Sequence, residues 1–205
     1  MRVISIHRQK GNIYSVLTDD GCEAMLDSST LEGAEDIAVG YETTAERLEE
    51  LQIQSDYNRA RIRSLELVAK KEYCRAELLR KLEGFPEAAA EAAADEMERL
   101  GFVDDERYAQ MYAEAAFRLK KHGWRRVSYD LSQKGIDRNV AEKVAKELAP
   151  EPAAVLDEIL AGRVGADLET EAGCRRCIAT LSRYGYDNAD IAAAMRRRAY
   201  GSENE

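Results

Sequence analysis

The sequence is poor in the residues that mark secreted, membrane-spanning or β-sandwich proteins. It has 3 prolines among 205 residues, and aromatic residues make up only 7% of it. No apolar run approaches the roughly 20 residues of a membrane span, and residues 1–20 lack the apolar stretch of a secretory signal. Charged residues, by contrast, reach 34%, which suits helices with a solvated face. We therefore expect a cytoplasmic, mainly helical protein that does not contact a membrane.

Residues that carry common catalytic chemistry are also scarce. The two histidines, His7 and His122, stand far apart in the sequence. The nucleotide-binding, hydrolase and metalloprotease motifs GxxxxGKS/T, GxSxG and HExxH are absent. The sequence therefore predicts neither an enzyme nor a bound cofactor.

The cysteines are four in number, and the last two form a CxxC: Cys22, Cys74, Cys174 and Cys177. A structural zinc site usually needs four Cys or His ligands in paired spacing, and no second pair exists here. The surrounding "AGCRRCIATL" is typical of a helix interior, so we expect reduced thiols packed within helices and no metal. A metal or redox role for Cys174 and Cys177 is the alternative.

The N-terminal residues alternate between apolar and polar side chains. Ile4 and Ile6 share one face of a predicted strand, and "QKGN" and "DDG" supply turns on either side of a second strand. This pattern predicts a small three-stranded antiparallel sheet. Such a sheet is marginal alone, so we expect it to pack on a helix within an N-terminal element of residues 1–57.

Beyond residue 57 the sequence has helical spacing and repeats itself. Three glycine turns, at Gly84, Gly135 and Gly185, lie 51 and 50 residues apart, and each is followed by a helix start. Glycine there fits the left-handed position after a helix. The period predicts three helical modules, at 58–101, 102–149 and 150–205, the last ending in a short acidic tail. The expected fold is mainly α, with tandem three-helix repeats in an elongated array.

The pair Asp104 and Asp105, in "LGFVDDERYAQMY", has two possible roles. It could be an acid/base pair, but such a pair needs a cleft that nothing in the sequence requires. A helix cap fits better, because Gly101 closes one helix and Asp104 stands where the next begins. We expect the following apolar stripe to face a core: Tyr108, Met111, Tyr112 and Ala115.

These segments carry a family resemblance. "LGFVDDERYAQMY", "KKHGWRRVSYDLSQKGI" and "AEKVAKEL" resemble the central signature of the RecX family, and the similarity runs over about residues 64–198. Cys74 stands where the family tends to have a serine cap. The segment "ELLRKLEGF" is about two residues short, so we expect a curtailed second helix in the first module. The resemblance implies tandem three-helix repeats in a regulator that binds the RecA recombinase or its DNA filament, and it favours inhibition.

The charge distribution follows the same period. The net charge is −9, yet residues 58–82, 118–134 and 173–200 are net +5, +5 and +4. These basic segments are either solvated helix faces or parts of one partner-binding surface on a monomer. The candidate partner-binding residues are Arg118, Lys120, Lys121, Arg125, Arg126, Lys134, Arg175, Arg176 and Arg183. Trp124, the only tryptophan, is expected to pack, and partner contact is its alternative role.

An alternative function is direct binding of single- or double-stranded DNA, with one module acting as a helix-turn-helix. A recognition helix should be basic or polar near its N-terminus. The third helices instead begin "PEAAAEAAADE", "DRNVAEK" and "DNADIAA", which are mostly acidic or apolar. This composition disfavours sequence-specific readout and leaves the filament regulator as the first hypothesis.

Overall fold

The computed structural model describes residues 1–202, and the side chains of residues 1–199. The end of the predicted acidic tail, residues 203–205, lies outside them. The chain divides into two compact units, Met1–Val103 and Asp104–Glu205, which are described in turn. Within the described residues, no helix combines the length and apolar character that a membrane crossing requires.

The first unit begins with the predicted sheet, in the order β1 (Val3–Arg8), β2 (Ile13–Thr18), β3 (Glu23–Asp27). Both strand pairs are antiparallel. Val16 and Leu26 are fully buried against Leu48 and Leu51 of helix α2 (Ala45–Val68). The sheet and its packing on a helix are therefore confirmed.

The outer edge of β3 is covered by side chains of α2. The amide of Met25 donates to Gln52 Oε1 at 2.6 Å, and the amide of Asp27 donates to Ser55 Oγ at 2.7 Å. These bonds satisfy strand groups that would otherwise be open to another chain. Side chains of α2 therefore accept the hydrogen bonds that a fourth strand would otherwise accept.

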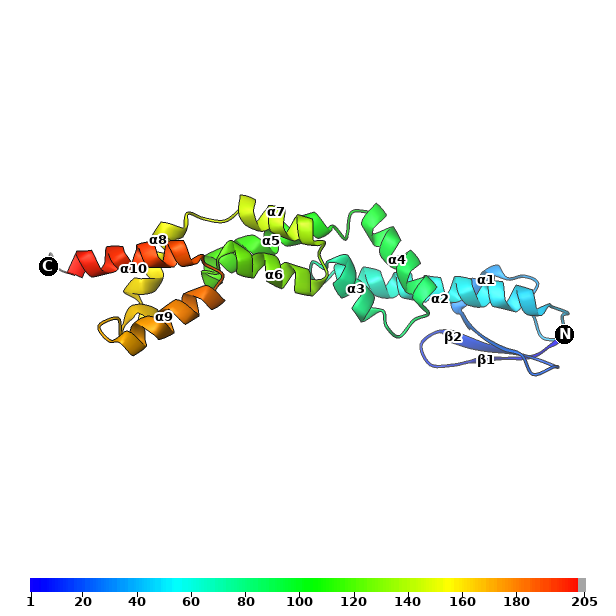
Figure 1. Cartoon of the computed structure of the whole chain (residues 1–205). Helices are drawn as coiled ribbons and strands as arrows, with labels where there is room; N and C mark the ends of the chain where they lie inside the picture. Colours follow the sequence, from blue (N-terminus) through cyan, green and yellow to red (C-terminus); the bar gives the residue numbers. More distant parts are fainter. Residues whose placement is uncertain (203–205) are drawn as a thin grey trace. The chain divides into compact units, whose positions relative to one another are not determined.

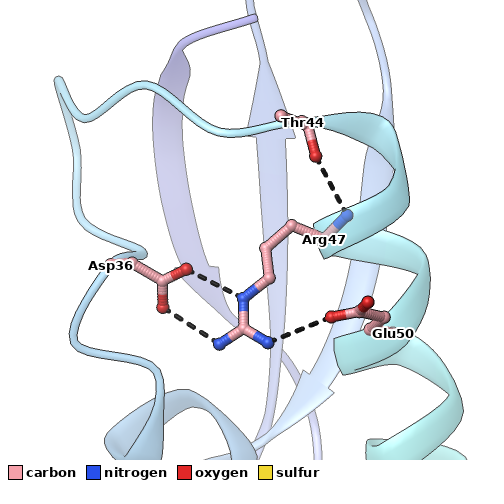
Figure 2. A network of polar contacts seen from close by, with 4 residues as sticks. All are labelled: Asp36, Thr44, Arg47 and Glu50. Atoms are coloured by element: carbon pink, nitrogen blue, oxygen red, sulfur yellow. Dashed lines mark hydrogen bonds and ion pairs between the residues drawn. The ribbon is translucent and has the colours of Figure 1, made fainter.

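The start of α2 is fixed by a polar network that Figure 2 shows. Thr44 caps the helix by accepting the amide of Arg47 at 3.2 Å. The guanidinium of Arg47 reaches Asp36 at 2.8 Å and Glu50 at 3.3 Å. The hydrogen bond from Arg47 lowers the pKa of Asp36. The network ties the loop after α1 (Ser28–Gly33) to the first turn of α2.

Helix α2 then continues without a break into the first helical module, as Figure 1 shows. The sequence places a boundary after residue 57, and this point falls inside a single helix of 24 residues. Helices α3 (Arg75–Lys81) and α4 (Glu87–Arg99) complete the module. Its core joins Ala60 of α2 to Leu78 of α3 and Met97 of α4.

Two expectations for the first module have opposite outcomes. Helix α3 has only 7 residues, against 11 in the corresponding α6, so the curtailed second helix is confirmed. Gly84, however, is absent from the glycines with positive φ, so its assignment as a left-handed helix stop was wrong. The short α3 ends at Lys81, three residues before the glycine, and needs no such residue.

The second unit begins with the middle module. Helix α5 (Asp105–Ala115) runs into a π-helical turn, η1 (Ala116–Lys120), and is followed by α6 (Trp124–Lys134) and α7 (Arg138–Glu147). Asp104 caps α5 and Asp137 caps α7 through their side chains. Gly135 has φ +100°, which confirms its predicted role.

The third module consists of α8 (Pro152–Ala161), a 3-10 turn η2 (Arg163–Gly165), α9 (Glu171–Arg183) and α10 (Asn188–Ser202). Its core includes Leu156, Leu160, Leu181 and Ile191. The mainly α fold with a small antiparallel sheet is thus confirmed. The elongated array and the module limits at 101/102 and 149/150 stay predictions.

Candidate partner-binding surface

The basic residues of the middle module surround one irregular connection. Arg118 and Lys120 lie in η1, where the chain leaves α-helical geometry. Such π-helical turns are rare and occur often at functional sites. Lys121 follows in the left-handed conformation with φ +53°, and α6 then begins directly after Gly123. The connection therefore brings the basic residues that follow α5 close to those at the start of α6.

Tyr112 and Asp130 form the centre of the surface. The Tyr112 hydroxyl donates to Asp130 Oδ2 at 3.3 Å, and Arg126 Nε lies 2.9 Å from Asp130 Oδ1. The ammonium groups of Lys120 and Lys134 lie 5.7 and 5.4 Å from the centre of the Tyr112 ring, within cation–π range. We call Lys120, Arg126 and Lys134, with Tyr112 and Asp130, the Tyr112 cluster.

The electrostatics of the Tyr112 cluster favour a net positive surface. Burial, and then the Asp130 carboxylate, raise the pKa of Tyr112, so its hydroxyl stays protonated and donates. Asp130 is the only acidic residue among residues 118–134. The six cations of this segment therefore outnumber its one carboxylate.

Two other candidates point away from the Tyr112 cluster, toward the third module. Lys121 Nζ lies 2.9 Å from Glu158 Oε2, and Arg125 Nη2 lies 2.7 Å from Asp187 Oδ1. Arg118 is exposed and makes no ion pair with any residue that the structure describes. The five basic residues of 118–126 therefore divide between an outward face and an internal contact.

The candidates of the third module form a separate group on α9. Arg175 pairs with Glu171 and Arg176 pairs with Asp167. Arg183 donates to Thr180 Oγ1 at 3.2 Å. None of these contacts, in the part of the chain described, reaches the Tyr112 cluster, and their charges are largely balanced within the module.

Apolar and aromatic side chains accompany the outward face, and of these sequence reasoning missed Leu119. Leu119 is 72% exposed between Arg118 and Lys120, and Tyr129 is 57% exposed beneath the guanidinium of Arg126 at 5.7 Å. Exposed apolar and aromatic residues beside cations are typical of binding surfaces. The signal available in the sequence was the run "FRLKKHGW", in which Leu119 stands alone among basic residues.

The predicted core stripe of α5 was wrong in its register. Met111 is 47% exposed, whereas Ala109, Ala113 and Ala116 are buried. The alanines let α5 approach its neighbours closely, and the larger side chains lie at the margin. Tyr112 is half-buried there, and this placement leaves its ring face open to Lys120 and Lys134.

The remaining candidates are Asp104, the cysteines and Trp124. Asp104 Oδ1 accepts the amide of Arg107 at 2.9 Å, as a helix cap does. All four cysteines are free thiols; Cys174 and Cys177 lie in α9, and burial raises the pKa of Cys177. Within residues 1–202, no group of three His, Cys, Asp or Glu side chains could hold a metal ion. Trp124 is half-buried, with Lys146 Nζ 4.7 Å from its ring centre.

Comparison with known proteins gives a consistent result. Residues 104–144, which include the whole Tyr112 cluster, match the family description "RecX, second three-helix domain". A regulatory protein RecX of Thermus thermophilus is 38% identical over 91 residues, which are 44% of this chain and 63% of that protein. The match therefore spans less than two thirds of that relative's length. RecX of Caldanaerobacter subterraneus subsp. tengcongensis is 27% identical over 187 residues, 89% of this chain and 90% of that protein.

Solved structures show the same fold. A crystal structure of regulatory protein RecX superposes with a TM-score of 0.68 at 16% identity, covering 94% of this chain and 98% of the other. RecX from Lactobacillus salivarius superposes with a TM-score of 0.63 at 16% identity, covering 70% and 97%. At these identities the superpositions speak for the fold alone.

Proposed function

This chain belongs to the RecX family, and from that premise we propose that it binds the RecA recombinase or its nucleoprotein filament and inhibits its activity. The relatives carry the name of regulatory proteins. The proposal places the contact on the outward face of the middle module, formed by Arg118, Leu119, Tyr129 and the Tyr112 cluster.

The choice of this surface rests on the interaction partners of two of its cations. Lys120 faces an aromatic ring, and Arg118 has no acidic partner among the described residues. A cation beside a ring keeps most of its attraction for a carboxylate or phosphate, because the ring carries no full charge. Acidic filament residues and DNA phosphates are both partners of this chemistry.

The second candidate function is binding of DNA alone. The basic surface favours it, but the third helix of the middle module opposes specific readout. Helix α7 begins at the carboxylate of Asp137, which already accepts the amides of Asn139 and Val140. A negative charge at the start of a helix repels the DNA backbone that a recognition helix must approach. A partner made of protein together with DNA therefore fits better.

The test is RecA ATPase activity on single-stranded DNA, with this protein titrated in. We expect Arg118→Ser with Lys120→Ser to weaken inhibition, and the loss to shrink as salt rises, since charge attraction is screened. Arg138→Ser with Lys143→Ser is the matched control, because it removes two charges from α7 in the same module. Equal potency of the cluster variant and the wild type across a salt series would refute this choice of surface.

A parallel measurement separates the two candidate functions. Binding to fluorescent single-stranded and double-stranded DNA is followed without RecA. If the wild type inhibits RecA at concentrations where it leaves DNA alone unbound, the filament is the partner. If DNA binding and inhibition share one midpoint and one salt dependence, direct DNA binding accounts for both.

A further inference from the structure

A turn of the third module is bonded to the connection that carries the basic residues. Residues 184–186, "YGY", form the turn between α9 and α10. The amide of Gly123 donates to the carbonyl oxygen of Tyr184 at 2.7 Å, and the Tyr186 hydroxyl donates to the carbonyl oxygen of Lys121 at 2.8 Å. The two hydrogen bonds hold both ends of the 121–123 turn against the third module.

The two turns approach so closely that only glycine fits at their crossing. A Cβ atom added at Gly123 would lie 2.4 Å from the carbonyl oxygen of Gly185. A Cβ atom added at Gly185, which has φ +91°, would lie 2.4 Å from the backbone nitrogen of Arg126. In both cases the obstructing atom belongs to the backbone and cannot turn aside. The crossing therefore fixes the position of α6 at its first turn.

Charged pairs lie on either side of the crossing. Lys121 reaches Glu158 on α8, and Arg125 reaches Asp187 just before α10. Lys121 also holds a left-handed backbone conformation, which costs free energy in a residue that has a Cβ atom. Such a conformation persists where the surroundings hold it, and here the bond from Tyr186 is made to the carbonyl of that same residue.

Comparison of the repeats separates the Tyr186 hydroxyl from the packing of its own module. The residue that follows the turn glycine is Phe85 in the first module, Ile136 in the second and Tyr186 in the third. Each contributes an apolar side chain, and Ile136 and Tyr186 are buried. Phe85 and Ile136 show that this position needs no hydroxyl. In the third module the hydroxyl serves a contact with a different module.

We propose that Tyr186 is a positioning residue for the basic surface of the middle module. By holding the 121–123 turn, it fixes the spacing between Arg118 and Lys120 on η1 and Arg126 and Lys134 on α6. A fixed spacing removes the entropy that these side chains would lose on binding a partner. The role in binding rests on the proposed function, whereas the role in fixing the turn is measured without any partner.

The first test uses the position of Trp124, the only tryptophan, directly after Gly123. In Tyr186→Phe, which keeps the ring, we expect acrylamide to quench Trp124 more strongly. The hydrogen of the Gly123 amide should exchange with solvent about two- to tenfold faster. This factor corresponds to the loss of about one net hydrogen bond. Tyr41→Phe, at an exposed tyrosine of the first unit, is the control and should change neither. Unchanged quenching and exchange in Tyr186→Phe would overturn the proposal.

The second test connects the turn to the partner. Tyr186→Phe should weaken RecA inhibition without lowering the melting temperature by more than Tyr41→Phe does. A loosened turn with unchanged inhibition, while Arg118→Ser with Lys120→Ser loses inhibition, would overturn the positioning role. If neither variant affects inhibition, the proposed surface fails instead, and the Trp124 and Gly123 measurements alone decide whether Tyr186 holds the turn.

Discussion

The first and middle modules carry basic segments of equal net charge that are used in different ways. Residues 58–82 and 118–134 are both net +5. In the first module, Arg75 lies 2.8 Å from Asp95 and 2.9 Å from Glu98, and it also pairs with Glu91. Arg61 Nε lies 2.7 Å from Glu96 Oε2. In the middle module, the pair of Arg126 with Asp130 stays within the basic segment itself.

The difference arises from the neighbouring helix. Helix α4 is acidic along the side that meets α2 and α3, so it neutralises much of the first basic segment within the module. In the middle module, the ring of Tyr112 on α5 lies beside Lys120 and Lys134, and an aromatic ring attracts cations without cancelling their charge. Formal charge therefore measures availability for a partner only after the internal ion pairs have been assigned.

The largest expected effect on stability is that of Arg75→Ala. It would leave Glu91, Asp95 and Glu98 close together on α4 without their shared cation. Because hydrogen bonds to charged groups contribute about 1.5–3 kcal/mol, we expect the free energy of unfolding to fall by roughly that amount in a denaturant titration followed by circular dichroism. Arg63→Ala, which removes an exposed pair with Glu66, should cost less than about 1 kcal/mol. Equal costs would show that the Arg75 network contributes no more to stability than an exposed ion pair.

Asp104→Ala should have the next largest effect, because it removes the side chain that caps α5. Loss of the cap should lower the free energy of unfolding by about 0.5–2 kcal/mol, as read by Trp124 fluorescence. RecA inhibition should persist while the protein is folded. Asp104→Asn is the matched control, since asparagine caps about as well as aspartate. If Asn were as harmful as Ala, charge rather than capping would be the cause.

A smaller effect is expected from acid, through His122. Burial lowers the pKa of His122 from 6.5; Lys120 and Arg126 act in the same direction and Asp130 opposes them. Below pH about 6.5 the unfolded chain therefore takes up a proton that the folded chain does not. Stability contributed by this residue is present above that pH and is lost as the pH falls through the folded pKa.

The measurement for His122 is the midpoint of protein unfolding, followed by Trp124 fluorescence, at pH 7.5 and at pH 5.5. His122→Asn should reduce the difference between the two midpoints. His7→Asn, on the exposed β1 residue, should leave it as in the wild type. A wild-type difference that survives in His122→Asn would assign the acid sensitivity to other groups.

The smallest effect on stability is expected from Arg118→Ser with Lys120→Ser. Neither residue forms an ion pair with a described carboxylate, so the free energy of unfolding should change by no more than about 0.5 kcal/mol. A denaturant titration beside the Arg75→Ala variant makes the comparison direct. A cost similar to that of Arg75→Ala would mean that the two basic segments have the same structural use.

The sequence predicted those features that depend on neighbouring residues. The cap at Asp104 was recognisable because the capping side chain and the amide that it accepts are separated by only three residues. Strand alternation likewise identified the sheet. Gly84 was misassigned because its turn resembles those of Gly135 and Gly185, although the shorter α3 ends before it.

The division of the basic residues could not be predicted from local sequence. Lys121 and Arg125 pair with Glu158 and Asp187, which lie in another module, and no local pattern shows which carboxylate each will meet. The stripe on α5 failed for a different reason. Hydrophobicity favoured Tyr108 and Met111 for the core, whereas close packing selected the small side chains of Ala109 and Ala113.

The unbroken α2 sets a rotational phase between the sheet and the first module. Its first half bears Leu48 and Leu51, which pack on the strands, and its second half bears Ala60 and Leu67, which pack in the module core. One residue inserted near Tyr57 would turn one half relative to the other by about 100° and shift it by about 1.5 Å. Seven residues, close to two full turns, would lengthen the helix and nearly restore the phase. We therefore expect length variation at this point to be tolerated in whole turns and not in single residues.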